Sequence, residues 1–147
     1  MKYESNRGLL MTAKEYLSQV EIKYKRLMHN IEELEELKSS AMYKANIEEA
    51  ERVQTSSGAG MADIINRYVD FEKEVEQEEW EYLNFRKEAY KRVFPVDEQF
   101  SVNILYERYF KYKRLDEIAD NRGYSLRQIE RMHSRAIIKF ESMWAGK

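Results

Sequence analysis

Residues 114–140 are the most informative stretch of the chain, and they read RLDEIADNRGYSLRQIERMHSRAIIKF. Two segments with apolar residues at helical spacing stand on either side of Gly123. This glycine can adopt a left-handed backbone conformation and so end the first helix. Ser125, followed three residues later by Gln128, has the spacing of a capping box and predicts the start of the second helix. The stretch therefore predicts two helices joined by a tight turn.

Both predicted helices have an apolar face. In the first helix this face consists of Leu115, Ile118 and Ala119. In the second it consists of Ile129, Met132, Ala136 and Phe140. The small side chain at position 119 would let the two helices cross closely. Such a pair is typical of a DNA-binding helix-turn-helix, although an ordinary helical hairpin has the same apolar pattern.

The opposite face of the second predicted helix favours DNA binding. Its side chains are Arg127, Gln128, Arg131, Ser134, Arg135 and Ile138. Arg and Gln are the side chains that make bidentate contacts to guanine and adenine edges. Acid is scarce here, because Glu130 is the one acidic residue before the last turn of this helix. We therefore expect Arg127, Gln128 and Arg131 to read bases.

Phosphate contacts are expected beside these base-reading residues, where the DNA backbone passes a docked helix-turn-helix. The expected set is Lys113, Arg114, Ser125, Ser134, Arg135 and Lys139. The distribution of charge supports this expectation. Residues 105–147 carry a net charge of +4 and the first 104 residues carry −6, although the chain as a whole carries only −2. This asymmetry is typical of a protein whose C-terminal part alone contacts phosphates.

Two long helices are predicted upstream. Heptad-spaced apolar residues in the first are Leu17, Val20, Tyr24, Leu27, Ile31 and Leu34. Those in the second, from about residue 61 to 93, are Ile64, Tyr68, Phe71, Val75, Tyr82, Phe85 and Ala89. Thr12 and Glu15 would cap the first helix, and Phe94-Pro95 would end the second. The intervening TSSGAG, residues 55–60, is read as a loop, so the two helices form an antiparallel, coiled-coil-like hairpin.

The predicted fold class is therefore all-α, with two parts. Residues 1–95 form the helical hairpin, an oligomerisation or partner-binding module, of which about the first eleven residues are a tail. Residues 96–147 form the helix-turn-helix domain, supported by a helix that Asp97 or Ser101 caps. The hairpin has more aromatic surface than two helices can bury between them, which predicts a homodimer. These aromatics are Tyr16, Tyr24, Tyr68, Phe71, Trp80, Tyr82 and Phe85.

Enzymatic chemistry is not expected. Glu130–His133 has the E-x-x-H spacing of a di-iron ligand pair, but such a site needs two copies. The sequence has no glycine-rich phosphate loop, nucleophile elbow or His-Glu metal motif, so no catalytic residue, cofactor or metal is predicted. It also has no cysteine, which excludes disulfides and fits the cytoplasm. No long apolar run predicts a signal peptide or a membrane span.

The C-terminal stretch resembles region 4 of bacterial sigma-70-type factors over about residues 102–144. The matching segments are Leu115–Ala119, Gly123–Ser125 and Ala136–Phe140. Gln128 and Arg131 fall where such factors place base-reading side chains. Arg114 and Leu126 depart from the pattern, so the DNA sequence recognised need not be the family's usual promoter element.

The whole layout resembles small phage transcription regulators of the ArpU/RinA-like kind. That resemblance implies a sequence-specific regulator, encoded by a phage or prophage and acting in the cytoplasm of the bacterial host. Its partners would be double-stranded DNA and RNA polymerase. Two alternatives stay open. One is a protein-interaction module, such as an anti-sigma, RNA-polymerase-binding or scaffold protein, and the other is a small-terminase-like packaging protein.

Overall fold

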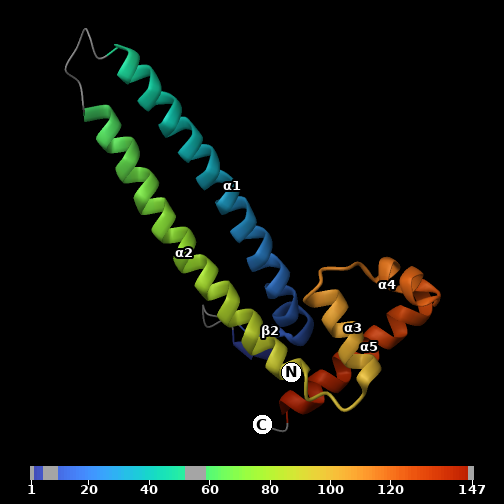
Figure 1. Ribbon diagram of the computed structural model, residues 1–147. Helices are drawn as coiled ribbons and strands as arrows, with labels where there is room; N and C mark the ends of the chain where they lie inside the picture. Colours follow the sequence, from blue (N-terminus) through green and yellow to red (C-terminus); the bar gives the residue numbers. More distant parts are fainter. Residues whose placement is uncertain (1, 5–9, 52–58, 146–147) are drawn as a thin grey trace. The chain divides into compact units, whose positions relative to one another are not determined.

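A computed structural model describes residues 2–4, 10–51 and 59–145, and the regular structure of these residues is helical apart from one short ribbon (Figure 1). The elements in order are β1 (Lys2–Glu4), β2 (Leu10–Thr12), α1 (Ala13–Glu51), α2 (Ala59–Val93), α3 (Gln99–Tyr109), α4 (Leu115–Arg122) and α5 (Leu126–Ala145). The two strands pair antiparallel, where the sequence predicts a tail. Within the described residues, no helix has the length and apolar content needed to cross a membrane.

The ends of the long helices follow the local sequence signals. The backbone N–H of Thr12 donates to Oε2 of Glu15 at 2.8 Å, and the N–H of Glu15 donates to Oγ1 of Thr12 at 3.2 Å. This capping box is the predicted one. Helix α2 ends at Val93, directly before Phe94-Pro95, also as predicted. Most of the predicted loop at 55–60 lies outside the described residues, and its last two residues, 59 and 60, already belong to α2.

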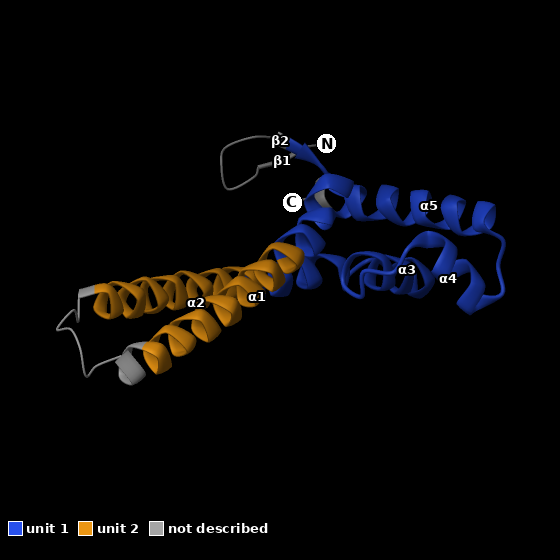
Figure 2. Cartoon of the chain, turned by 90° about the horizontal axis from the view of Figure 1, so that it is seen from above, with its two compact units in different colours: residues 1–23, 83–147 blue, residues 24–82 orange. Residues whose placement is uncertain are grey.

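Contacts divide the chain into two compact units (Figure 2). Unit 1 comprises residues 1–23 and 83–147, and unit 2 comprises residues 24–82. The sequence places its one boundary elsewhere, between residues 95 and 96. The difference arises because the beginning of α1 and the end of α2 share a core with α5. The ring of Tyr16 stacks on Phe140 with centroids 6.4 Å apart and lies 5.4 Å from Phe85.

Unit 2 consists of the facing segments of α1 and α2, which run side by side in opposite directions (Figures 1 and 2). The ring centroids of Tyr24 and Tyr82 are 5.8 Å apart. Glu78 accepts a hydrogen bond from Asn30 and forms an ion pair with Arg26. All heptad positions predicted for these segments are buried or half-buried, so they are the covered side of both helices.

In unit 1, helices α3, α4 and α5 pack against one another around a small apolar core. Its members are Ile104, Ile118, Ala119 and Ile129, with Phe100, Leu115 and Met132 packed against them. The predicted caps of α3 are wrong. Its N-cap is Glu98, whose side chain makes no capping hydrogen bond. Of the two predicted caps, Ser101 is buried within the helix, and Asp97 accepts a hydrogen bond from Lys139.

Candidate nucleic-acid interface

The turn between α4 and α5 is built as the sequence predicts. Gly123 has φ +72° and ends α4 in the left-handed conformation. The N–H of Tyr124 then donates to the carbonyl of Ala119 at 3.0 Å, which satisfies a carbonyl at the end of α4. Ser125 and Gln128 cap α5 reciprocally. The backbone N–H of Ser125 donates to Oε1 of Gln128 at 2.9 Å, and that of Gln128 donates to Oγ of Ser125 at 3.2 Å.

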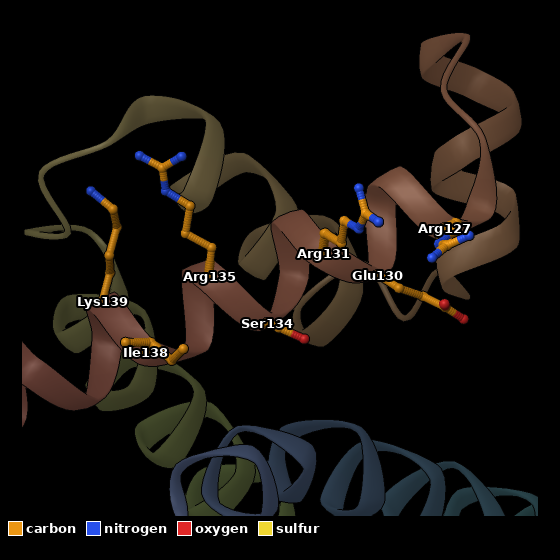
Figure 3. A pocket seen from close by; sticks show the side chains of 7 residues that line it. All are labelled: Arg127, Glu130, Arg131, Ser134, Arg135, Ile138 and Lys139. Carbon is orange, nitrogen blue, oxygen red and sulfur yellow. The ribbon is translucent and has the colours of Figure 1, made fainter.

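The buried face of α5 fixes which side chains point outward. Ile129 and Ala136 are fully buried, and Met132 packs against the core between them. At 100° per residue, the residues on the opposite side of the helix must then face solvent. This outward face forms an open hollow (Figure 3). Its lining consists of Arg127, Glu130, Arg131, Ser134, Arg135, Ile138 and Lys139. Four cationic side chains and one carboxylate give the hollow a positive charge.

Arg127 and Arg131 are the two cations of this hollow that have no acidic partner among the described residues. Both side chains are exposed, and they lie one turn apart in the first half of α5. Among the residues that the structure describes, neither forms an ion pair within 4.0 Å. Their guanidinium groups therefore keep the five-donor fork that binds phosphate or a guanine edge. The exposed hydroxyl of Ser134 adds a further donor and acceptor on the same face.

Gln128, the third predicted base reader, is occupied by its capping role. Its Oε1 accepts from both the backbone N–H and the hydroxyl of Ser125, at 2.9 and 3.1 Å. A bidentate contact to adenine needs the amide oxygen as well as the amide nitrogen. Base reading through this oxygen would therefore require the cap to open. The hydroxyl of Ser125, predicted to contact phosphate, is held in the same cap.

Acidic side chains neutralise the other predicted phosphate contacts. Arg135 lies 3.3 Å from a carboxylate oxygen of Glu98, and Lys139 lies 2.9 Å from the same carboxylate and 3.1 Å from Asp97. Hydrogen bonds from Lys139 to Glu98 and then Asp97 raise the pKa of this ammonium group. These acids lie about forty residues upstream of α5, so no local pattern reveals the pairing.

Before α4, the two predicted phosphate contacts are also paired with acids. Nζ of Lys113 lies 3.7 Å from Glu107. Nε of Arg114 lies 3.1 Å from Asp116, and a second nitrogen of that guanidinium lies 3.6 Å from Glu117. The hydrogen bond to Asp116 raises the pKa of Arg114 and lowers that of the carboxyl. Because the Arg114 pair is exposed, it contributes little to stability, and an anion can displace it at little cost.

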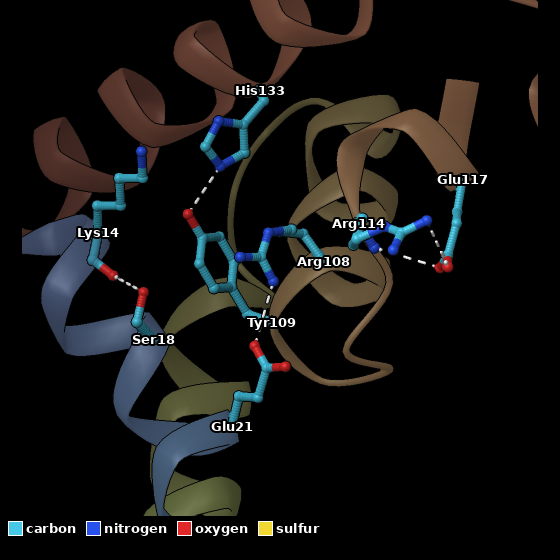
Figure 4. Close-up of polar contacts among 8 residues, drawn as sticks. All are labelled: Lys14, Ser18, Glu21, Arg108, Tyr109, Arg114, Glu117 and His133. Carbon is cyan, nitrogen blue, oxygen red and sulfur yellow. Dashed lines mark hydrogen bonds and ion pairs between the residues drawn. The ribbon is translucent and has the colours of Figure 1, made fainter. Parts of the chain in front are cut away.

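A buried polar pair supports α5 from behind (Figure 4). The hydroxyl of Tyr109 lies 2.7 Å from Nε2 of His133, and both side chains are buried. Burial, followed by the positive charges of Lys14 and Arg108, lowers the pKa of His133 to about 4. The imidazole is therefore neutral at pH 7. His133 is four residues after Ile129 and three before Ala136, so it lies beside the apolar stripe of the helix. This spacing is the feature of the sequence from which the burial of His133 could be predicted.

Metal-ligating groups do not gather in the part of the chain that the structure describes. There, no three His, Cys, Asp or Glu side chains are placed to hold an ion. The chain matches no protein-family model, no curated protein and no solved structure.

Proposed function

We propose that the chain is a sequence-specific DNA-binding transcription regulator. In this proposal α4 and α5 form a helix-turn-helix of the sigma-region-4-like kind, and α5 enters the major groove. Its source is a phage or prophage, its place of action is the cytoplasm of a bacterial host, and RNA polymerase is a further partner, as the resemblance implies. A dimer would deliver two such helices to DNA.

One observation carries the proposal. Arg127 and Arg131 present two exposed guanidinium groups, without ion-pair partners in the described residues, on the first two turns of α5. This is the part of a recognition helix that contacts base edges. The back of the same helix is locked against α3 and α4, so the arginines project from a rigid surface. Rigid presentation favours bidentate contacts, because less freedom is lost on binding.

The test starts from duplexes selected by the protein from a random DNA library. Binding of the best duplex and of an unrelated duplex is then compared for the wild type and for Arg131→Ala. Each good bidentate contact supplies about 1–3 kcal/mol of discrimination between bases. The variant should therefore lose preference for the selected sequence by that amount. Arg67→Ala is the matched control, since it removes an exposed arginine from α2.

An unchanged preference in Arg131→Ala would remove this arginine from the base-reading set. Failure of the wild type to bind any duplex at low salt would reject the DNA-binding function. The protein-interaction alternative would then lead. One observation favours it, because apolar Ile138 is 62% exposed on the same face. Binding to RNA polymerase that persists at high salt would support that alternative.

A further inference from the structure

Helix α2 carries a second apolar stripe besides the one that faces α1. We name it the outer stripe, and it consists of Ile65, Val69, Trp80, Leu83, Tyr90 and Phe94. These side chains are 40–65% exposed. At 100° per residue their positions fall within an arc of about 80°. Phe94 continues the helical path, since its N–H donates to the carbonyl of Tyr90 at 2.9 Å.

The outer stripe is distinct from the covered side of α2. Val75, Tyr82 and Ala89 are buried toward α1, at positions about 120° around the helix from the outer stripe. An amphipathic helix needs one apolar stripe for each neighbour that it packs against. Two stripes therefore indicate two neighbours. Helix α1 supplies the first. Within the chain, Tyr90 of the outer stripe packs on Tyr106 and Phe110, with ring centroids 6.1 and 5.9 Å apart, so a second neighbour is needed mainly for the rest of the stripe. Large apolar side chains that remain exposed along one face mark an interaction surface.

The sequence predicts a dimer because seven aromatic residues of the hairpin would need a partner to cover them. In the structure, most of these residues are already covered by the chain itself. Six of these seven are buried or half-buried within the chain, and Trp80 alone is exposed, at 64%. A partner is therefore expected to cover the outer stripe around this tryptophan and not the whole hairpin.

Charge along α2 changes sign close to Trp80. Residues 70–81 carry seven acids and one base, a net charge of −6. Residues 83–93 carry four bases and one acid, a net charge of +3. A partner with complementary charge must be basic opposite residues 70–81 and acidic opposite residues 83–93. A second α2 helix running antiparallel has this distribution of charge.

We propose that a second copy of the chain covers the outer stripe, with the two α2 helices antiparallel about a twofold axis between residues 81 and 82. In this register, the residue numbers of two facing residues add up to 163. Trp80 then packs on Leu83 of the copy, and Val69 packs on Phe94. Glu76 faces Lys87 of the copy, and all these contacts occur twice because the interface is isologous.

The surface around Trp80 is hollowed. A shallow hollow lies on α2 there, lined by Lys73, Glu76, Gln77 and Trp80. In the proposed register, Leu83 and Lys87 of the copy lie over it. Parallel pairing would instead place each acidic residue of 70–81 against its own equivalent, and like charges in contact are destabilising. Antiparallel pairing is therefore the favoured arrangement.

A charge-reversal series without DNA tests the register. Self-association of the full chain is followed by sedimentation velocity over a range of micromolar concentrations. Glu76→Lys alone or Lys87→Glu alone should weaken the dimer at least about tenfold, since each puts like charges into two symmetric layers. The double variant should restore dimerisation. Glu74→Lys is the matched control, because this exposed acid lies on the opposite side of α2.

Cysteine cross-linking gives an independent answer, because the chain has no native cysteine. A variant with both Glu76→Cys and Lys87→Cys should form a disulfide-linked dimer under mild oxidation. The two positions are about 16 Å apart along one helix, at 1.5 Å per residue, which is too far for a disulfide within one chain. Each single cysteine variant should give no cross-linked dimer in the antiparallel register.

Two results would overturn the inference. One is a strictly monomeric wild type at tens of micromolar, and the other is a dimer that survives both single charge reversals. Rapid cross-linking of the Glu76→Cys single variant would indicate parallel pairing instead. Far-UV circular dichroism establishes that each variant is folded, and all the changed positions are exposed. The inference names the surface of the dimer proposed above, and its failure leaves the DNA-binding proposal intact.

Discussion

Gly123 shows how a single residue positions the candidate interface. Its φ of +72° lies in the left-handed region, and an added Cβ would meet nothing within 4 Å. Glycine is therefore required here for its backbone conformation and not for lack of space. The conformation lets the chain reverse after α4, so that α5 starts three residues later.

Replacing Gly123 by Ala is expected to lower the free energy of unfolding by about 1–2 kcal/mol, the cost of a left-handed conformation for a residue with a Cβ. Chemical denaturation of the variant measures this change. Gly123→Asn should cost less, since asparagine visits this region more readily. Equal stability of the alanine variant and the wild type would mean that the turn does not limit the stability of the fold.

His133 is the second residue with a measurable consequence, since burial holds its folded pKa near 4 and an unfolded histidine titrates near 6.5. Between these pH values the unfolded chain binds more protons. The free energy of unfolding should therefore fall as the pH decreases through this window, by at most about 3 kcal/mol. His133→Gln keeps a hydrogen-bonding side chain near Tyr109 and should show a smaller loss between pH 7 and pH 5.

Denaturation at several pH values, compared between variant and wild type, isolates this contribution from the titration of carboxylates. His29→Gln is the matched control, because that side chain is exposed on α1. Identical pH dependence in the wild type and His133→Gln would show that the buried imidazole does not contribute to acid sensitivity.

At the scale of elements, α5 combines two roles on opposite faces. One face holds the core of unit 1 through Ile129, Ala136 and Phe140. The other face presents cations, of which Arg127 and Arg131 are open while Arg135 and Lys139 are bound to acids before α3. The positive field of α5 is therefore strongest in its first half.

Glu98→Gln should increase DNA affinity, because Glu98 contacts both Arg135 and Lys139. Each cation released to a phosphate adds about 0.9 to the slope of log affinity against log salt. Titration of a selected duplex at several salt concentrations measures that slope. Glu36→Gln is the control, since it removes an exposed acid from α1. A slope equal to that of the wild type would mean that Arg135 and Lys139 do not reach DNA phosphates.

At the scale of the whole molecule, the described residues include two exposed surfaces of different chemistry. The hollow on α5 is cationic and is proposed to bind DNA. The outer stripe of α2 is apolar with segregated charge and is proposed to bind a second copy. Because they belong to different elements, substitutions in one should leave the other function measurable.

The proposed dimer predicts a twofold DNA site, since each copy presents one α5. Duplexes selected by the wild type should contain an inverted repeat, and those selected by the monomeric Glu76→Lys variant should contain a single half-site. Sequencing of both selected pools makes the comparison. Single half-sites in both pools would show that the dimer does not engage DNA through two recognition helices.

Features that depend on local chemistry could be predicted from the sequence. The capping boxes at Thr12 and Ser125, the end of α2 before Pro95 and the left-handed stop at Gly123 all follow from neighbours within four residues. Heptad spacing likewise predicted the covered side of α1 and α2, because helical periodicity places those residues on one face.

Which of the candidate side chains are paired with acids depends on tertiary packing. Glu98 and Asp97 neutralise cations of α5 about forty residues away, and Tyr109 buries His133 across two helices. Such pairs arise only when segments distant in the chain are packed together, and no spacing rule encodes them. Packing also joined the base of the long helices to α5 and left the outer stripe exposed, because a helix pair covers only one side of each helix.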